Sequence, residues 1–172
     1  MYLPFLRGKL YELKAIKEFV GESYGRDYGR HVMPIVEPVK KDLRPLVSCM
    51  EVMGGAKMPF AIVMNSRMGD FQRMYFDVES FVSNEKIKNI NWTPAFEVNG
   101  DANIERIEQQ IADYAFRDVM LIFFSTVDLD NVSIRRLVTS PAVKYVVAMN
   151  LTQRPPIITE LKEFGKELIT LE

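Results

Sequence analysis

The sequence contains one cysteine, Cys49, and one histidine, His31. A single cysteine excludes an internal disulfide and favours a reducing compartment, so we expect a cytoplasmic protein. The same counts exclude metal sites built from clusters of cysteine and histidine, and no metal site is predicted. The sequence also lacks a G-x-G-x-x-G fingerprint for dinucleotides, and no cofactor is predicted.

Long apolar runs and an excess of one charge are also absent. No uninterrupted apolar run approaches the about 20 residues that span a bilayer, so no membrane contact is predicted. The chain has 22 basic and 23 acidic residues and a formal net charge of −1. This balance creates no global field that would attract nucleic acid or an anionic membrane. A polyanionic partner would therefore need a local basic patch.

The chain has 172 residues, of which 48% are hydrophobic. This length is sufficient for one substantial core and short for two ordinary domains. We therefore predict a single domain over residues 1–172.

Seven short apolar runs, rich in β-branched and aromatic residues, organise the chain. The middle runs are nearly continuous in Val, Ile, Phe and Met, which is typical of strands covered by helices on both faces. The predicted strands are residues 2–6, 32–36, 60–64, 93–98, 119–124, 143–149 and 168–171.

The segments between the runs carry apolar residues at helical spacing. The first stripe extends from Leu10 to Val20, and Gly21 is a suitable stop. The last helix is predicted over 159–164, and residues 78–87 are also expected to be helical. The other helices are predicted to begin at side chains that cap free N–H groups, namely Asp42, Asp101 or Asn103, and Asp128 or Asp130.

Alternation of strand and helix predicts an α/β fold with a mostly parallel sheet, which is either open and doubly wound or closed into a barrel. The turn after the first run, Leu6–Lys9 (LRGK), lacks the glycine pattern of a dinucleotide-binding sheet. Seven strands are one fewer than a TIM barrel needs, so we predict an incomplete TIM-barrel-like repeat of strand–helix units. An unclosed sheet has exposed edges, and we expect a homodimer formed through an open edge.

Polar residues follow the strands at the end that hosts active sites in parallel α/β folds. If the strands are parallel, we expect these side chains to meet at one mouth and to bind a small polar or anionic ligand. The alternative is that strands simply end where polarity begins. The candidate residues are Arg7, Lys9, Glu37, Asn65, Glu97 and Asn150, with Ser125 and Asn99 at equivalent positions.

Two kinds of chemistry fit this set. Glu37 and Glu97 are the candidate catalytic carboxylates, because general acid and base catalysis of glycoside cleavage uses such a pair. Arg7 and Lys9 are candidates for holding a phosphate or a carboxylate, although they also fit the solvated start of the first helix. Glu37, which is followed by Pro38, could instead cap a turn or pair with Lys40. A magnesium or calcium site from these carboxylates has no signature spacing.

Two other features favour structural interpretations. His31 precedes the second strand, opposite the predicted mouth, and a structural or surface role is expected. The segment Gly21–Arg30 contains Tyr-Gly-Arg twice, which interleaves aromatic and guanidinium groups as in binders of single-stranded nucleic acid. Two copies on the helix-to-strand side are weak support, so nucleic-acid binding is not expected.

Four segments resemble the beta-protein family, a group of bacterial and phage proteins named after a bacteriophage beta protein. They are Tyr2–Glu12 (YLPFLRGKLYE), Pro34–Lys40 (PIVEPVK), Pro59–Asn65 (PFAIVMN) and Gly69–Asp70. The resemblance implies a barrel-like α/β fold and a phage or prophage connection, and it implies no particular activity. Family members are longer and carry a further strand-bearing segment.

Our leading hypothesis is a phage-related protein that binds or hydrolyses a small polar or anionic ligand at the mouth. Glu37 or Glu97 would act as the base, while Arg7 and Lys9 orient the anion. The alternative is a non-enzymatic interaction module in phage–host conflict, which would act through the open sheet edge or the Tyr-Gly-Arg segment.

Overall fold

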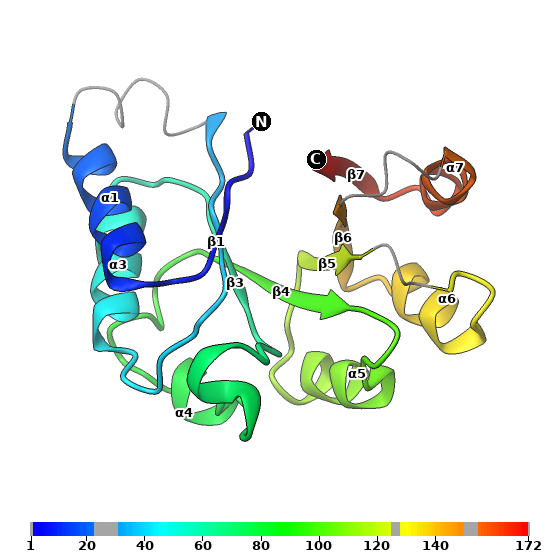
Figure 1. Cartoon of the computed structure of the whole chain (residues 1–172), viewed down its shortest axis with the longest axis horizontal. Coiled ribbons are helices and arrows are strands. Elements are labelled where there is room, and N and C mark those ends of the chain that lie inside the picture. Colours follow the sequence, from blue (N-terminus) through cyan, green and yellow to red (C-terminus); the bar gives the residue numbers. More distant parts are fainter. Residues whose placement is uncertain (1, 23–30, 125–127, 150–154, 172) are drawn as a thin grey trace. The chain divides into compact units, whose positions relative to one another are not determined.

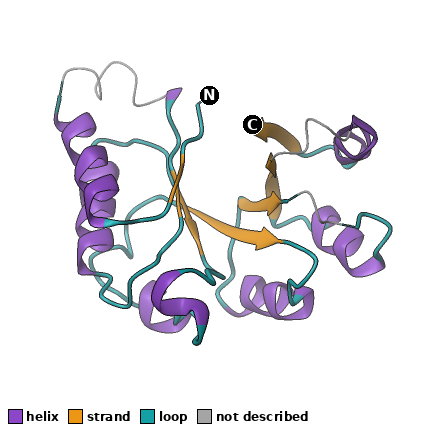
Figure 2. Cartoon of the chain, in the orientation of Figure 1, coloured by secondary structure: helices purple, strands orange, loops and turns teal. Residues whose placement is uncertain are grey.

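A strand followed by helical structure is the unit that repeats along the chain (Figures 1 and 2). A computed structural model describes residues 2–22, 31–124, 128–149 and 155–171. The strands are β1 (Phe5–Leu6), β2 (Ile35–Val36), β3 (Ala61–Val63), β4 (Thr93–Val98), β5 (Val119–Phe123), β6 (Val143–Met149) and β7 (Glu167–Leu171). The helices are α1 (Leu10–Gly21), α3 (Arg44–Gly55), the 3-10 helix η2 (Gly69–Gln72), α4 (Val78–Val82), α5 (Ile104–Asp113), α6 (Val132–Thr139) and α7 (Pro155–Glu163).

Backbone contacts divide the chain into two compact units, which are described separately below. Unit 1 is Met1–Thr93 and unit 2 is Pro94–Glu172. The single domain expected from chain length stays a prediction.

Unit 1 contains three short parallel strands. Phe5 of β1 is opposite Ile35 of β2, and Ile35 is opposite Ala61 of β3. Both residues of β2 and all three of β3 are buried, as expected for strands that are covered on both faces. Helices α1 and α3 pack against each other beside these strands (Figure 1). They bury the apolar side chains of Leu13, Ile16, Leu46, Val47, Cys49, Met50 and Met53.

Unit 2 contains the longer strands, which are also parallel from β4 to β7. Leu121 of β5 lies opposite Phe96 of β4 and Val146 of β6. Every residue of β5 is buried, consistent with its continuous apolar sequence. Helix α5 begins at Asn103, whose side chain accepts a hydrogen bond from the backbone N–H of Arg106.

These observations confirm the α/β class and the repeat of strand–helix units. Within the described residues there are seven strands, as predicted from the apolar runs, and the strand pairing inside each unit is parallel. Among the same residues, no helix has both the length and the apolarity that crossing a membrane requires.

Four predicted helix limits were wrong. Helix α7 begins at Pro155 and not at residue 159. The N-cap of α3 is Leu43 and not Asp42, whose carboxylate accepts hydrogen bonds from the backbone N–H and the guanidinium of Arg44, two residues further on. The N-cap of α6 is Asn131, which accepts from two backbone N–H groups, whereas Asp128 stabilises the preceding turn. Helix α4 ends at Val82, and turns replace the rest of the predicted helix over 78–87.

Candidate functional site

The carboxyl ends of β1 and β2 bring Arg7 and Glu37 together. Each residue directly follows its strand, and the backbone N–H of Glu37 donates to the carbonyl of Leu6 over 2.8 Å, which continues the parallel pairing. Nη1 of Arg7 donates to Oε2 of Glu37 over 2.5 Å. This ion pair is the centre of the candidate site in unit 1.

The Glu37 carboxylate is fully buried, whereas the Arg7 side chain is 44% exposed. The hydroxyl of Ser66, a residue that is itself buried, donates to Oε1 of Glu37 over 3.0 Å. Both carboxylate oxygens therefore have a donor, which a buried charge requires to be stable. Glu37 acts as the buried anchor of a guanidinium that is partly open to solvent.

The turn between β1 and α1 is held by Glu12. Its carboxylate accepts from the backbone N–H of Lys9 at 2.9 Å and of Arg7 at 3.3 Å. Gly8 lies between them with a φ of +61°, and a Cβ at this position would be 2.8 Å from the carbonyl oxygen of Glu37. Glycine is required here because it permits both this φ and the close approach of the two chains. The turn therefore positions Arg7 beside Glu37.

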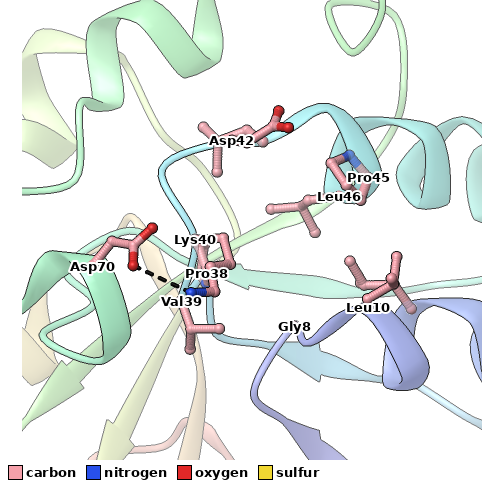
Figure 3. Close-up of a pocket in the computed structure, with 11 residues that line it drawn as sticks. Gly8, Leu10, Pro38, Val39, Lys40, Asp42, Pro45, Leu46 and Asp70 are labelled. Atoms are coloured by element: carbon pink, nitrogen blue, oxygen red, sulfur yellow. Dashed lines mark hydrogen bonds and ion pairs between the residues drawn. The ribbon is translucent and has the colours of Figure 1, made fainter.

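A pocket of about 280 Å³ begins at this turn (Figure 3). Its walls are mainly apolar and come from α1, from the segment after β2 and from α3. A charged pair, Lys40 and Asp70, also lines it, with Nζ and Oδ1 3.4 Å apart. The other lining residues are Gly8, Leu10, Leu13, Pro38, Val39, Asp42, Leu43, Pro45 and Leu46.

The Asp70 carboxylate is fixed at this pocket by the backbone. It accepts from the N–H of Lys41 at 2.9 Å, and the N–H of Asp70 donates to the carbonyl of Val39 at 2.9 Å. The hydrogen bond from Lys41, followed by that from Lys40, lowers the pKa of Asp70 below its ordinary value. Asp70 is therefore an anion at neutral pH, and it offsets the charge of Lys40.

The other predicted site residues have different positions. Lys9 is exposed at the start of α1, and Asn65 is half-buried two residues after β3. Glu97 lies inside β4, opposite Ile122 of β5 in unit 2. The carboxylate pair of Glu37 and Glu97 thus spans two units and stays a prediction. Asn150 and Ser125 lie outside the described residues, as do residues 23–30 of the Tyr-Gly-Arg segment.

Two residues of the site were not identified from the sequence. Ser66 directly follows Asn65, three residues after β3, so the strand-end rule could have included it together with Asn65. Glu12 stands three residues after Lys9, the spacing of the acidic member of a capping box. His31 is exposed and precedes β2, in agreement with the surface position expected for it.

The part of the chain that the structure describes contains no group of three or more His, Cys, Asp or Glu side chains that could hold a metal ion. No family model, no curated protein and no solved structure matches the chain. The site is therefore interpreted from its own geometry.

Proposed function

We propose that this protein binds a small polar or anionic ligand at the carboxyl ends of the unit 1 strands, and that Arg7 contacts the anion. The supporting observation is a half-exposed guanidinium fixed by a fully buried carboxylate, that of Glu37. A guanidinium has five N–H donors in a planar fork that matches carboxylates and phosphates. Fixing one edge of the fork on Glu37 leaves other donors for a ligand.

Preorganisation is the physical basis of this proposal. A free arginine side chain loses rotamer freedom when it binds a ligand, and this loss weakens affinity. Glu37 and the ring of Phe5, which lies 5.8 Å from the guanidinium carbon, restrict Arg7 before any ligand arrives. The entropy loss on ligand binding is then smaller.

We propose that the Glu37 carboxylate positions Arg7 and does not act as a base in hydrolysis. It has no exposed surface, and both of its oxygens accept hydrogen bonds from Arg7 and Ser66. A general base must reach the proton that it removes, and this carboxylate faces its own donors. Glu37 is thus a positioning residue. We propose Lys9 as a second cation on the same turn, with Asn65, after β3, as an amide group of the site.

The resemblance to the beta-protein family is part of this proposal. Arg7 lies in the segment Tyr2–Glu12 and Glu37 lies in Pro34–Lys40, the two most specific of the resembling segments. We accordingly propose a cytoplasmic, phage-related protein whose ligand binding depends on this ion pair.

Ligand titrations of the full chain test the proposal. Inorganic phosphate and succinate serve as probes, with binding followed by calorimetry and by backbone NMR shifts. A charge-assisted hydrogen bond contributes about 1.5–3 kcal/mol, so Arg7→Ala is expected to weaken binding by about tenfold or more. Glu37→Gln keeps the shape but removes the anchoring charge, and it should weaken binding less than Arg7→Ala.

Arg73→Ala is the matched control, because Arg73 is another exposed arginine of unit 1 and the ion pair with the buried Glu37 is made by Arg7. It should leave the affinity unchanged. Wild-type affinity in a folded Arg7→Ala variant would overturn the assignment of the site, as would absence of binding of both probes to the wild type.

A further inference from the structure

A second hollow in unit 1, of about 510 Å³, has a wall that carries only positive charge. It lies between the first turns of α3 and the region of α4, two elements that are close together in Figure 1. The cationic lining residues are Lys41, Arg44 and Lys86. The neutral polar ones are Ser80 and Asn84, and the apolar ones are Leu43, Val47 and Phe81.

The three cations differ in their carboxylate partners. Arg44 binds Asp42 through two nitrogens, at 2.8 and 2.7 Å. Lys86 lies 3.8 Å from Glu51, a long contact between exposed groups. The Lys41 side chain has no ion pair among the described residues. The nearby Asp70 carboxylate accepts the backbone N–H of Lys41 and pairs with the side chain of Lys40. Lys41 therefore contributes a full positive charge to the hollow.

The apolar part of the wall is rigid. Phe81 is 2% exposed, and its ring packs edge-on against Phe76 at 5.2 Å and Trp92 at 5.7 Å between centroids. Val47, which is 5% exposed, belongs to the buried face of α3. Val47 and Phe81 thus form the apolar floor of the hollow, with the two lysines and Ser80 also in its lining.

We propose that this hollow is a binding site for a phosphorylated small molecule that carries an aromatic group. Lys41 and Lys86 supply point charges for the phosphate, and Ser80 and Asn84 supply neutral hydrogen-bonding groups. The aromatic part packs against the apolar lining, which consists of the half-buried Leu43 together with the buried Val47 and Phe81. The volume is within the range of about 300–1,000 Å³ that is common for small-ligand sites. No residue of the Arg7–Glu37 pair lines the hollow, so this site is additional to the proposed function.

Titration with adenosine monophosphate tests the inference on the full chain. Lys41→Ala is the informative variant, because it removes the unpaired ammonium and keeps the backbone hydrogen bond to Asp70. We expect it to weaken binding by about fivefold to tenfold, the equivalent of about 1 kcal/mol. Lys88→Ala is the matched control, since Lys88 pairs with Glu85 and does not line the hollow, and it should bind as the wild type does.

Two further titrations examine the ligand class. Adenosine lacks the phosphate and inorganic phosphate lacks the ring, so in the Arg7→Ala variant, which removes the other proposed anion contact, each should bind at least about tenfold more weakly than the nucleotide. Equal binding of phosphate and nucleotide would overturn the aromatic part of the inference. Equal effects of Lys41→Ala and Lys88→Ala would indicate non-specific attraction and would overturn the site.

Different results would contradict the two proposed sites. Arg7→Ala should leave nucleotide binding intact, and Lys41→Ala should leave succinate binding intact. Nucleotide binding that depends on Arg7 and not on Lys41 would overturn this inference while it supports the site at Arg7.

Discussion

Nη1 of Arg7 lies 2.5 Å from Oε2 of Glu37, although 30 positions separate the two residues in the chain. The parallel pairing of β1 and β2 produces this proximity, because each residue comes directly after its strand. Ser66, after β3, completes the arrangement from the third strand. Three consecutive strand ends thus build one buried carboxylate site.

Loss of the Arg7 side chain should destabilise the protein. Arg7→Ala removes the charged partner of the buried Glu37 carboxylate, which keeps its hydrogen bond from the Ser66 hydroxyl. Removing one partner of a fully buried ion pair lowers the free energy of unfolding by about 3–5 kcal/mol. Because Arg7 is partly exposed, we expect a smaller loss of about 1–3 kcal/mol, which urea unfolding measures. Arg44→Ala breaks an exposed pair, which solvent screens, and should change the free energy of unfolding much less. Equal losses in the two variants would contradict the role of burial.

Gly8→Ala should also be destabilising. The new methyl group would sit 2.8 Å from the carbonyl oxygen of Glu37, at a φ of +61° that side chains disfavour. We expect a loss of about 2 kcal/mol or more and shifted resonances for Arg7. Gly21→Ala is the control, because no atom lies within 4 Å of the added Cβ at the end of α1. Its free energy of unfolding should stay equal or rise slightly, and a loss as large as that of Gly8→Ala would oppose this explanation.

Cys49 should be unreactive in the folded protein. Its thiol is buried in α3, and burial raises its pKa to about 11. Because the thiolate is the reactive form, alkylation at pH 8 should proceed only as fast as the chain opens. Urea should accelerate it in parallel with unfolding. Ser83→Cys in a Cys49→Ala background places a thiol at an exposed position, and this variant should react at once. Rapid labelling of Cys49 in the native chain would contradict its burial.

Asp42 should titrate at unusually low pH. Hydrogen bonds from the side chain and then the backbone of Arg44 lower its pKa from 3.8 to about 2. Since the folded-state pKa is depressed, the stabilising contribution is present above pH 4 and is lost as the pH falls towards 2. A carboxyl NMR titration measures the midpoint. Arg44→Ala should raise this midpoint towards 3.8, and a midpoint that is insensitive to that substitution would be inconsistent with the pair.

The homodimer expected from an open sheet edge is testable at β7. Within unit 2 this strand pairs with β6 alone, and Leu168, Ile169 and Leu171 are only half-buried. Exposed strand edges favour pairing with another chain. Sedimentation equilibrium should give twice the 19.9 kDa mass of one chain. A strict monomer at high protein concentration would remove this prediction.

The sequence predicts the strands well because buried parallel strands have continuous apolar sequences. Both ends of β4 and of β6 match the predicted runs. The first two strands are shorter than their runs, since only two residues of each form the regular ladder and Tyr2 pairs with Val32 in a separate bridge. The first residues of the helices were harder to predict. Several neighbouring Asp and Asn side chains can cap a helix N-terminus, and tertiary contacts select one of them, as at Asn131.

The site was predictable only in part. Arg7 and Glu37 follow from the rule that strand ends meet in a parallel sheet, and the structure pairs them. The burial of Glu37 does not follow from that rule, because it depends on the path of the chain after β3 that brings Ser66 over the carboxylate. The pocket beside Gly8 also depends on packing of α1 against α3, which local sequence does not specify.

The most direct test of the account is an NMR titration that observes the Arg7 guanidinium itself. Inorganic phosphate and succinate are added to the wild-type chain and to Glu37→Gln, and the Arg7 side-chain N–H resonances are followed. We predict saturable shifts of these resonances in the wild type and weaker binding in Glu37→Gln. Arg7 resonances that stay unchanged while the anion binds elsewhere on the chain would contradict the central claim that Arg7, anchored by Glu37, is the anion contact.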